Sequence, residues 1–406
     1  MKPGTQGFVG ERLREAREAR GLTITSLAEL TTISKQSISD YEHGKATPHP
    51  DHSIALADKL NLPIAFFLDE YSYEDTSPIY NRSMASATKG PRIKSRRRYD
   101  WLRRVVGFLS QYVEFPKLDL PMPLTAEHSS LIRPEDIEAA AERARIHFGL
   151  GVGPIDNITW LLENHGVVIG LASFGSAYLD SFSQVCSDGR AYAIINAEAG
   201  SAVRYRYDLA HELGHLCLHR NLDPRQIQAA AIAPEIERQA NAFAGEFLMP
   251  SKTFAKTFRA INVDGLKPTK LTWKVSMQAA LMHALRLGLV TKEQSERMWR
   301  SFAARGWRKS EPFDNVMEPE QPELLRGAFD AVLQNGVTPA EICDALPFTA
   351  WEIETLCGLE PGKLGAKPTV ATAVRLTPAP SRQPQRPDRV REPKGDVVAF
   401  RRPDRS

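Results

Sequence analysis

His211, Glu212 and His215 form an H-E-x-x-H pattern, the part of the chain best suited to chemistry. Residues four apart on a helix lie on the same face, and their positions are about 6 Å apart along the axis. Two imidazoles at that spacing can bind one metal ion. Glu212 can then act as general base for a water molecule at the metal, as this pattern does in zinc peptidases. With ten histidines in the chain, a chance match is expected in about one or two such sequences per hundred. The alternative is a pair of core histidines on a buried helix.

A catalytic zinc usually has three protein ligands, so the third must come from another segment. His219 lies eight residues beyond His211, about 12 Å further along a straight helix, and is too distant to share the ion. The predicted helix in Pro234–Pro250 offers three acidic candidates, Glu235, Glu237 and Glu246. We favour Glu237, because Asn241 lies one turn later on the same face and can hydrogen-bond a ligating imidazole.

The sequence patterns around these residues predict an α+β unit that positions them. Helical periodicity at 137–148 and 155–163 precedes the run HGVVIGLA, which is bounded by glycines and predicts a strand. A second strand is expected at 190–197, and the H-E-x-x-H stretch lies on the helix that follows. Further helices are expected at about 229–247, 276–287 and 292–304, and in two pieces between 322 and 356.

These segments together resemble the ImmA/IrrE family of bacterial metallopeptidases over roughly residues 130–260. The matching motifs are GPIDN, RYRYDLAHELGHLCLH and ERQANAFAGEFLMP, in the family's order. The resemblance implies a zincin-like α+β fold with a small sheet. The site that it implies is Zn²⁺ held by His211, His215 and Glu237, with Glu212 as the catalytic base.

The stretch LTITSLAELTTISKQSISDYEHGKATP predicts a helix-turn-helix unit near the N-terminus. Thr23 can cap a helix that ends near Leu30, and Ser34 can cap a second helix after a short turn. The second helix of such a unit enters the major groove of DNA. Ile38 and Tyr41 should face inward. The outward polar residues are candidate DNA contacts: Ser34, Lys35, Gln36, Ser39, Asp40 and Lys45.

This N-terminal stretch resembles the repressor-type helix-turn-helix of the XRE family over about residues 8–68, including the motif SDYEHGKATP. The family usually has glycine at the turn position that Thr32 or its neighbour occupies here. The resemblance implies binding to double-stranded DNA as a homodimer. It places three residues at base-contacting positions and one near phosphate, namely Lys35, Gln36 and Asp40, and Lys45. The alternative is a helical bundle used only for protein contacts.

Length and composition limit the class of protein. A chain of 406 residues with a net charge of +3 predicts two or three domains, and any nucleic-acid binding must depend on local clusters of charge. No apolar run resembles a signal sequence or a membrane span, so we expect a cytoplasmic protein without a membrane partner. The four cysteines include no CxxC pair, which argues against a disulfide framework.

We expect a mostly α chain of five segments. These are a five-helix-type helix-turn-helix domain at 1–70, a linker with a basic helical segment at 71–125, the peptidase-like domain at 126–260, a helical extension at 261–362 and a disordered, basic, proline-rich tail at 363–406. The run Lys89–Arg104 carries eight Lys and Arg residues. It either adds phosphate contacts or is a solvated face of the linker.

The leading hypothesis is a DNA-binding transcriptional regulator with a zinc-dependent endopeptidase domain that cleaves a protein partner. The family resemblance points to a repressor as that partner. The alternative is a non-proteolytic regulator, or an antitoxin-like module, whose metal-site domain senses a ligand or partner. An intact Glu212 favours the enzyme, since a sensor has no need of a base there. A general degradative protease fits poorly with a DNA-binding domain.

Overall fold

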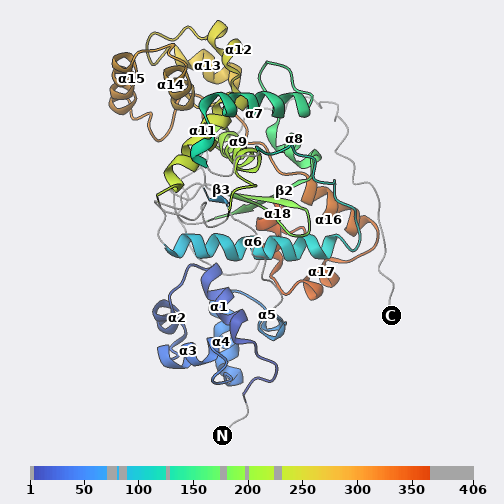
Figure 1. Ribbon diagram of the computed structural model, residues 1–406. Helices are drawn as coiled ribbons and strands as arrows, with labels where there is room; N and C mark the ends of the chain where they lie inside the picture. Colours follow the sequence, from blue (N-terminus) through green and yellow to red (C-terminus); the bar gives the residue numbers. More distant parts are fainter. Residues whose placement is uncertain are drawn as a thin grey trace, which may run out of the picture.

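The computed structural model describes residues 4–70, 80–81, 89–124, 129–173, 181–196, 201–223 and 231–365. This described part is mostly helical and contains a four-stranded sheet of order β1-β3-β4-β2 (Figure 1). The predicted fold class, mostly α with a small sheet, is therefore confirmed. No described helix combines the length and apolarity needed to cross a membrane. The predicted disordered tail lies, from residue 366 onward, outside the described residues.

The N-terminal bundle has the five helices expected of a helix-turn-helix domain. Thr23 Oγ1 accepts a hydrogen bond from the amide of Ser26, and Ser34 Oγ accepts one from the amide of Ser37. Both predicted caps are thus confirmed, since each hydroxyl satisfies an amide that has no partner within its helix. The five helices are α1 (Gly10–Ala19), α2 (Ile24–Thr31), α3 (Lys35–Glu42), α4 (Pro50–Leu60) and α5 (Ile64–Leu68).

Thr32 ends α2 in the left-handed conformation, with φ of 60°. This conformation costs an L-residue about 1–2 kcal/mol, and more readily suits glycine. We expect Thr32→Gly to raise the local free energy of unfolding of α2 and α3 by about 1 kcal/mol, measured by hydrogen exchange of their amides. Thr25→Gly, a control at an exposed position inside α2, should lower it instead. Equal effects of the two substitutions would contradict the assignment of strain to Thr32.

The basic segment forms a long helix, α6 (Lys89–Leu109), that lies between the helix-turn-helix bundle and the sheet (Figure 1). Tyr99, Trp101 and Leu102 on this helix are buried. The Trp101 indole donates a 2.6 Å hydrogen bond to Glu15 in α1. Helix α6 is therefore a core element of the fold, although the high charge of this segment favours a linker in the sequence analysis.

The arginines of α6 are paired with acidic residues of the elements on either side. Arg97 contacts Glu18 of α1 at 2.8 Å, and Arg104 pairs with Asp69 after α5. Arg98 pairs with Glu352 near the C-terminal end of the described chain. These ion pairs join the bundle and the C-terminal helices to α6, so these three guanidinium groups do not form a solvated face.

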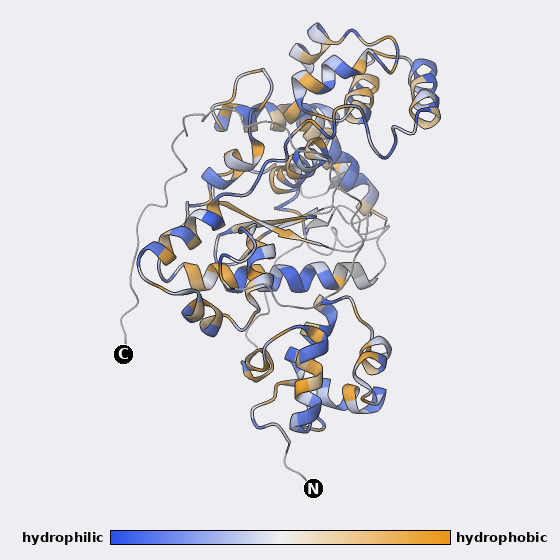
Figure 2. Cartoon of the chain, turned by 180° about the vertical axis from the view of Figure 1, so that it is seen from behind, coloured by the Kyte–Doolittle hydropathy of each residue, from blue (hydrophilic) through white to orange (hydrophobic). Residues whose placement is uncertain are grey.

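The sheet is built on two parallel, almost fully buried strands, β2 (Val167–Ala172) and β4 (Ala191–Asn196). Both were expected, and Figure 2 shows them as apolar. The antiparallel neighbour of β4 is β3 (Ser181–Val185), and β1 (Tyr80–Asn81) pairs antiparallel with β3. Neither β1 nor β3 was predicted. The residues of β3 include buried serines and a glutamine, so the strand lacks a strong apolar signal.

Alternate residues of the central strands face two different cores. Val167 and Ile169 belong to the core on the side of the helix that carries the H-E-x-x-H pattern, whereas Val168 belongs to the core with α6 and the N-terminal bundle. A strand with both faces covered reads as a continuous apolar run. The elements of the first side are η1 (Ser129–Leu131), α7 (Pro134–His147), α8 (Ile158–Asn164), α9 (Ala202–Leu218), α11 (Ala233–Leu248) and α12 (Ser251–Thr257).

The predicted C-terminal extension divides into two parts with different locations. Helices α13 (Leu266–Trp273), α14 (Met277–Arg286) and α15 (Lys292–Ala304) lie beyond α11 (Figure 1). The chain then returns to the sheet, where α16 and α18 contact β2 and α6. Three helices fill this last stretch, where two were expected: α16 (Leu324–Gln334), α17 (Pro339–Ala345) and α18 (Ala350–Cys357).

Candidate metal centre and DNA-binding surface

The H-E-x-x-H stretch lies in α9, which packs between α11 and strands β3 and β4. Gly214 allows this close packing. A Cβ at that position would lie 3.1 Å from the carbonyl oxygen of Ala240 and 3.2 Å from Cβ of Phe243, both in α11. Because glycine has no side chain, the two helix backbones can approach closely enough to bring Glu237 to the histidines.

His211, His215 and Glu237 converge on one point. The two histidine Nε2 atoms lie 3.0 Å apart. Glu237 Oε2 lies 3.3 Å from His211 Nε2, and Glu237 Oε1 lies 3.6 Å from His215 Nε2. Ligands 2.0–2.1 Å from a tetrahedral zinc lie about 3.3 Å from one another. Two imidazoles and a carboxylate are also a donor set that zinc prefers, so these residues fit the ion.

The three side chains of this cluster differ in burial. Both histidine side chains are buried, whereas the Glu237 side chain is 20% exposed. The exposed part of the three side chains therefore belongs to Glu237, on α11.

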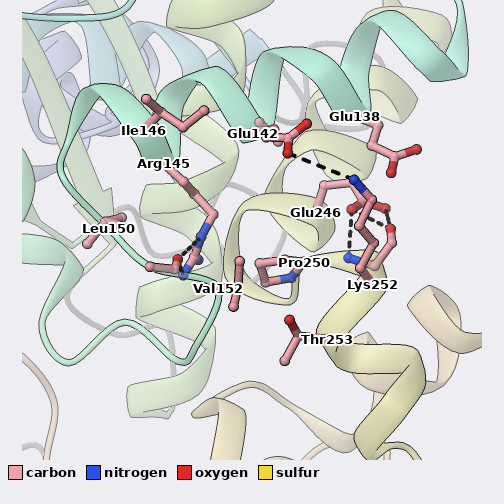
Figure 3. A pocket seen from close by; sticks show the side chains of 13 residues that line it. Glu138, Glu142, Arg145, Ile146, Leu150, Val152, Glu246, Pro250, Lys252 and Thr253 are labelled. Atoms are coloured by element: carbon pink, nitrogen blue, oxygen red, sulfur yellow. Dashed lines mark hydrogen bonds and ion pairs between the residues drawn. The ribbon is translucent and has the colours of Figure 1, made fainter.

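The two alternative acids are engaged elsewhere. Glu235 pairs with Arg238 at 2.6 Å in its own helix, and Glu246 pairs with Arg286 at 2.8 Å. Figure 3 shows Glu246 in a groove formed by α7, the end of α11 and α12, close to Lys252. In the same groove, the Arg145 guanidinium donates to backbone carbonyls of the loop after α7. Glu246 and Arg145, which line this groove, thus make contacts within the chain.

Glu212 is held by a residue that the sequence did not single out. Ser181 Oγ, at the start of β3, donates a 2.6 Å hydrogen bond to Glu212 Oε1, and both side chains are buried. A hydroxyl donor stabilises and orients an ionised carboxylate. The only sequence signal for Ser181 is the alternation of serine with Phe182 in a strand that was not recognised.

His219 contacts the Nδ1 side of the His215 ring, opposite the Nε2 atom that faces His211 and Glu237. The two Nδ1 atoms lie 3.1 Å apart, and His219 Nε2 lies 3.0 Å from Oε1 of Gln239 in α11. Burial lowers the pKa of His219 to about 4. His219 thus lies outside the three-residue cluster, as its distance along the helix indicated.

Asn241 does not occupy the position expected of it. We predicted a hydrogen bond from this side chain to a ligating imidazole. Instead, Asn241 Nδ2 donates to the backbone carbonyl of Glu237, 2.8 Å away in the same helix. In the described part of the chain, Gln239 is the amide side chain that contacts His219, the C-cap residue of α9. Its position, two residues after Glu237, turns it towards His219.

The candidate DNA contacts lie on and beside α3, at the end of the bundle away from α6 (Figure 1). Ile38 and Tyr41 are buried, as predicted. Gln36 Nε2 donates to Asp40 Oδ1 at 3.0 Å, so the two outward side chains orient each other. The candidates divide by exposure: Ser34, Lys35, Gln36 and Lys45 are exposed, whereas Ser39 and Asp40 are half-buried.

Two stretches of the chain match known protein families. Residues 162–284 match the peptidase M78 family, described as the IrrE N-terminal-like domain, and residues 13–67 match the helix-turn-helix family. The chain thus holds one stretch similar to a helix-turn-helix domain and one similar to an IrrE N-terminal-like domain. The first match contains all three residues of the metal-site cluster, and the second contains α2 and α3.

Several curated proteins are similar to shorter parts of the chain. The HTH-type transcriptional regulator DdrOP3 of Deinococcus deserti is 28% identical over 95 residues, which are 23% of this chain and 74% of that protein. The regulator ImmR of Bacillus subtilis is 30% identical over 81 residues, 20% of this chain and 64% of ImmR. An HTH-type transcriptional regulatory protein of Methanothermobacter thermautotrophicus is 34% identical over 70 residues. This chain covers 22% of the length of the archaeal protein.

Proposed function

We propose that this chain is a DNA-binding transcriptional regulator whose second domain is a zinc-dependent endopeptidase. The observation that carries the proposal is the convergence of His211, His215 and Glu237 on one point, with Glu212 next to the first ligand. Further support comes from the match to a peptidase family and from relatives named as transcriptional regulators. The proposed substrate is a protein partner, with a repressor as the first candidate.

The chemistry divides between the metal and the chain. His211, His215 and Glu237 would hold a zinc ion, which would supply Lewis acidity towards a scissile carbonyl and a water molecule. Glu212 accepts the proton of the attacking water and returns it to the leaving amide nitrogen. Ser181 holds Oε1 of that carboxylate at 2.6 Å, and we assign proton transfer to Oε2. No serine or cysteine nucleophile is required, because water is the nucleophile.

The proposed activity can be tested without knowing the substrate. Cells expressing the wild-type chain or its Glu212→Gln variant are compared by labelling and sequencing protein N-termini. We expect a small set of new internal N-termini in the wild-type cells alone, with a DNA-binding repressor among the cleaved proteins. Identical sets of N-termini in both strains, with zinc bound to both proteins, would support the non-proteolytic sensor instead.

DNA binding makes a separate prediction. Lys35→Ala removes an exposed donor from the start of α3, and loss of a base contact weakens binding by about 10-fold to 100-fold. Lys292→Ala is the charge-matched control, since Lys292 is exposed on α15 at the other end of the molecule (Figure 1). The measurement is affinity for DNA selected by the wild-type protein from a random duplex library. Equal affinities of the two variants would contradict a role of α3 in recognition.

The selected DNA also tests the predicted homodimer. Two copies of a helix-turn-helix protein bind half-sites about one helical turn apart, related by two-fold symmetry. We expect the selected sequences to be palindromic with that spacing. A single half-site without symmetry would indicate that one copy of the chain binds DNA alone.

A further inference from the structure

We propose that Gln239 and His219 fix the tautomer of His215, so that the Nε2 lone pair of His215 points into the metal site. Both are positioning residues, and neither belongs to the cluster of three ligands. The inference rests on the metal site of the proposed function and does not require peptide hydrolysis. Its basis is a series of hydrogen bonds that runs from Ser129 in η1 to the metal site.

The orientation of the Gln239 amide is set by two acceptors. Gln239 Nε2 donates to the carbonyl oxygen of Ser129 at 2.7 Å and to Oε1 of Glu235 at 2.9 Å. A backbone carbonyl and an ionised carboxylate only accept hydrogen bonds. Reversing the amide would place its oxygen against both of them. The oxygen of this fully buried side chain therefore faces His219.

That amide oxygen determines which nitrogen of His219 carries its proton. His219 Nε2 lies 3.0 Å from Gln239 Oε1 and must donate, because the oxygen only accepts. A neutral imidazole ring that donates from Nε2 can only accept at Nδ1. Its Nδ1 is therefore the acceptor. The atom 3.1 Å away is Nδ1 of His215, which in turn must donate.

The result for His215 is the tautomer that a metal ligand needs. With its proton on Nδ1, Nε2 has a lone pair that faces His211 Nε2 at 3.0 Å and Glu237 Oε1 at 3.6 Å. The opposite tautomer would place an N–H in the position of the ion. Ligating histidines commonly donate their second N–H to a carboxylate or carbonyl. Here the acceptor is the Nδ1 atom of a second imidazole, His219. That atom can accept because the proton of His219 is on Nε2, which donates to Gln239.

The test compares zinc affinities of the full chain, measured by competition with a chelator. His219→Leu removes the acceptor, and we expect zinc affinity to fall by about 10-fold to 100-fold, as for other groups that support a metal ligand. His219→Asn is the matched variant, because its amide oxygen can still accept from His215 Nδ1, and its affinity should stay close to wild type. In metal-free protein, ¹⁵N imidazole shifts should place the His215 proton on Nδ1.

Two results would overturn the proposal: wild-type affinity in His219→Leu, or an equal loss in both His219 variants. If His219→Leu does not fold, as judged by thermal unfolding, Gln239→Met removes the acceptor for His219 Nε2 with little change in volume. We expect a loss of about 10-fold, and unchanged affinity there also overturns the proposal. A wild-type chain that binds no zinc refutes the metal site itself. A chain that shows these zinc affinities but cleaves nothing refutes only the peptidase.

Discussion

Replacing Glu212 by glutamine is expected to slow peptide hydrolysis by between about 10²-fold and 10⁴-fold, the range that a positioned general base contributes. Glutamine keeps the shape of the side chain and an oxygen that can accept from Ser181, but it cannot take a proton from water. The rate is measured on a synthetic peptide that spans a cleavage site found by N-terminal labelling. Zinc content should match the wild type, because Glu212 is outside the cluster of three ligands.

The matched control for this substitution is Glu246→Gln. Glu246 is a mostly buried glutamate that pairs with Arg286, outside the metal-site cluster. We expect this variant to cleave the peptide at close to the wild-type rate. Hydrolysis by Glu212→Gln at the wild-type rate would show that another group serves as the base or that the activity comes from a contaminant.

Replacing Glu237 by glutamine is expected to lower zinc affinity by more than about 100-fold, since a ligand should contribute more than the 10-fold to 100-fold of a supporting group. The carboxylate is the only anionic ligand in the cluster, and it neutralises part of the charge of the ion. Affinity is measured by chelator competition. The DNA-binding bundle should be unaffected, because it lies across α6 and the sheet from α11 (Figure 1).

The same experiment decides among the three acids of one predicted helix. Glu246→Gln should keep wild-type zinc affinity, because its carboxylate pairs with Arg286 outside the cluster. Glu235→Gln should lower zinc affinity only slightly, because Gln239 still donates to the carbonyl oxygen of Ser129. Loss of zinc in Glu246→Gln, with retention in Glu237→Gln, would contradict the assigned ligand set.

Local sequence signals predicted the parts of the site that lie within one element. The caps Thr23 and Ser34 and the inward residues Ile38 and Tyr41 follow from helical periodicity, and the structure confirms them. The four-residue spacing of His211 and His215 places both on one face of a helix for the same reason. Helix geometry relates near neighbours along the chain, so no tertiary information was needed.

Contacts between elements were predicted less well. Ser181 was missed because β3 is short and polar, so nothing marked it as the strand beside α9. Asn241 was expected to hold an imidazole, but Gln239 contacts His219 instead. Helical spacing predicts which residues of α11 lie on the same face as Glu237. Which of the residues of α11 contacts α9 depends on how the two helices cross.

The sequence by itself determined the two kinds of domain, the pair of histidines, the adjacent glutamate and the polar face of α3. Each is encoded in residues a few positions apart, where backbone geometry is nearly the same in every protein. The sequence favoured Glu237 among three acids, and the tertiary structure shows that this one meets the histidines. Only the tertiary structure decided which serine holds Glu212 and why α6 is so basic. Those answers depend on the approach of segments as far apart as Ser129 and Gln239, or Arg98 and Glu352. Close packing between elements sets that approach, and packing is a property of the whole core rather than of any one stretch.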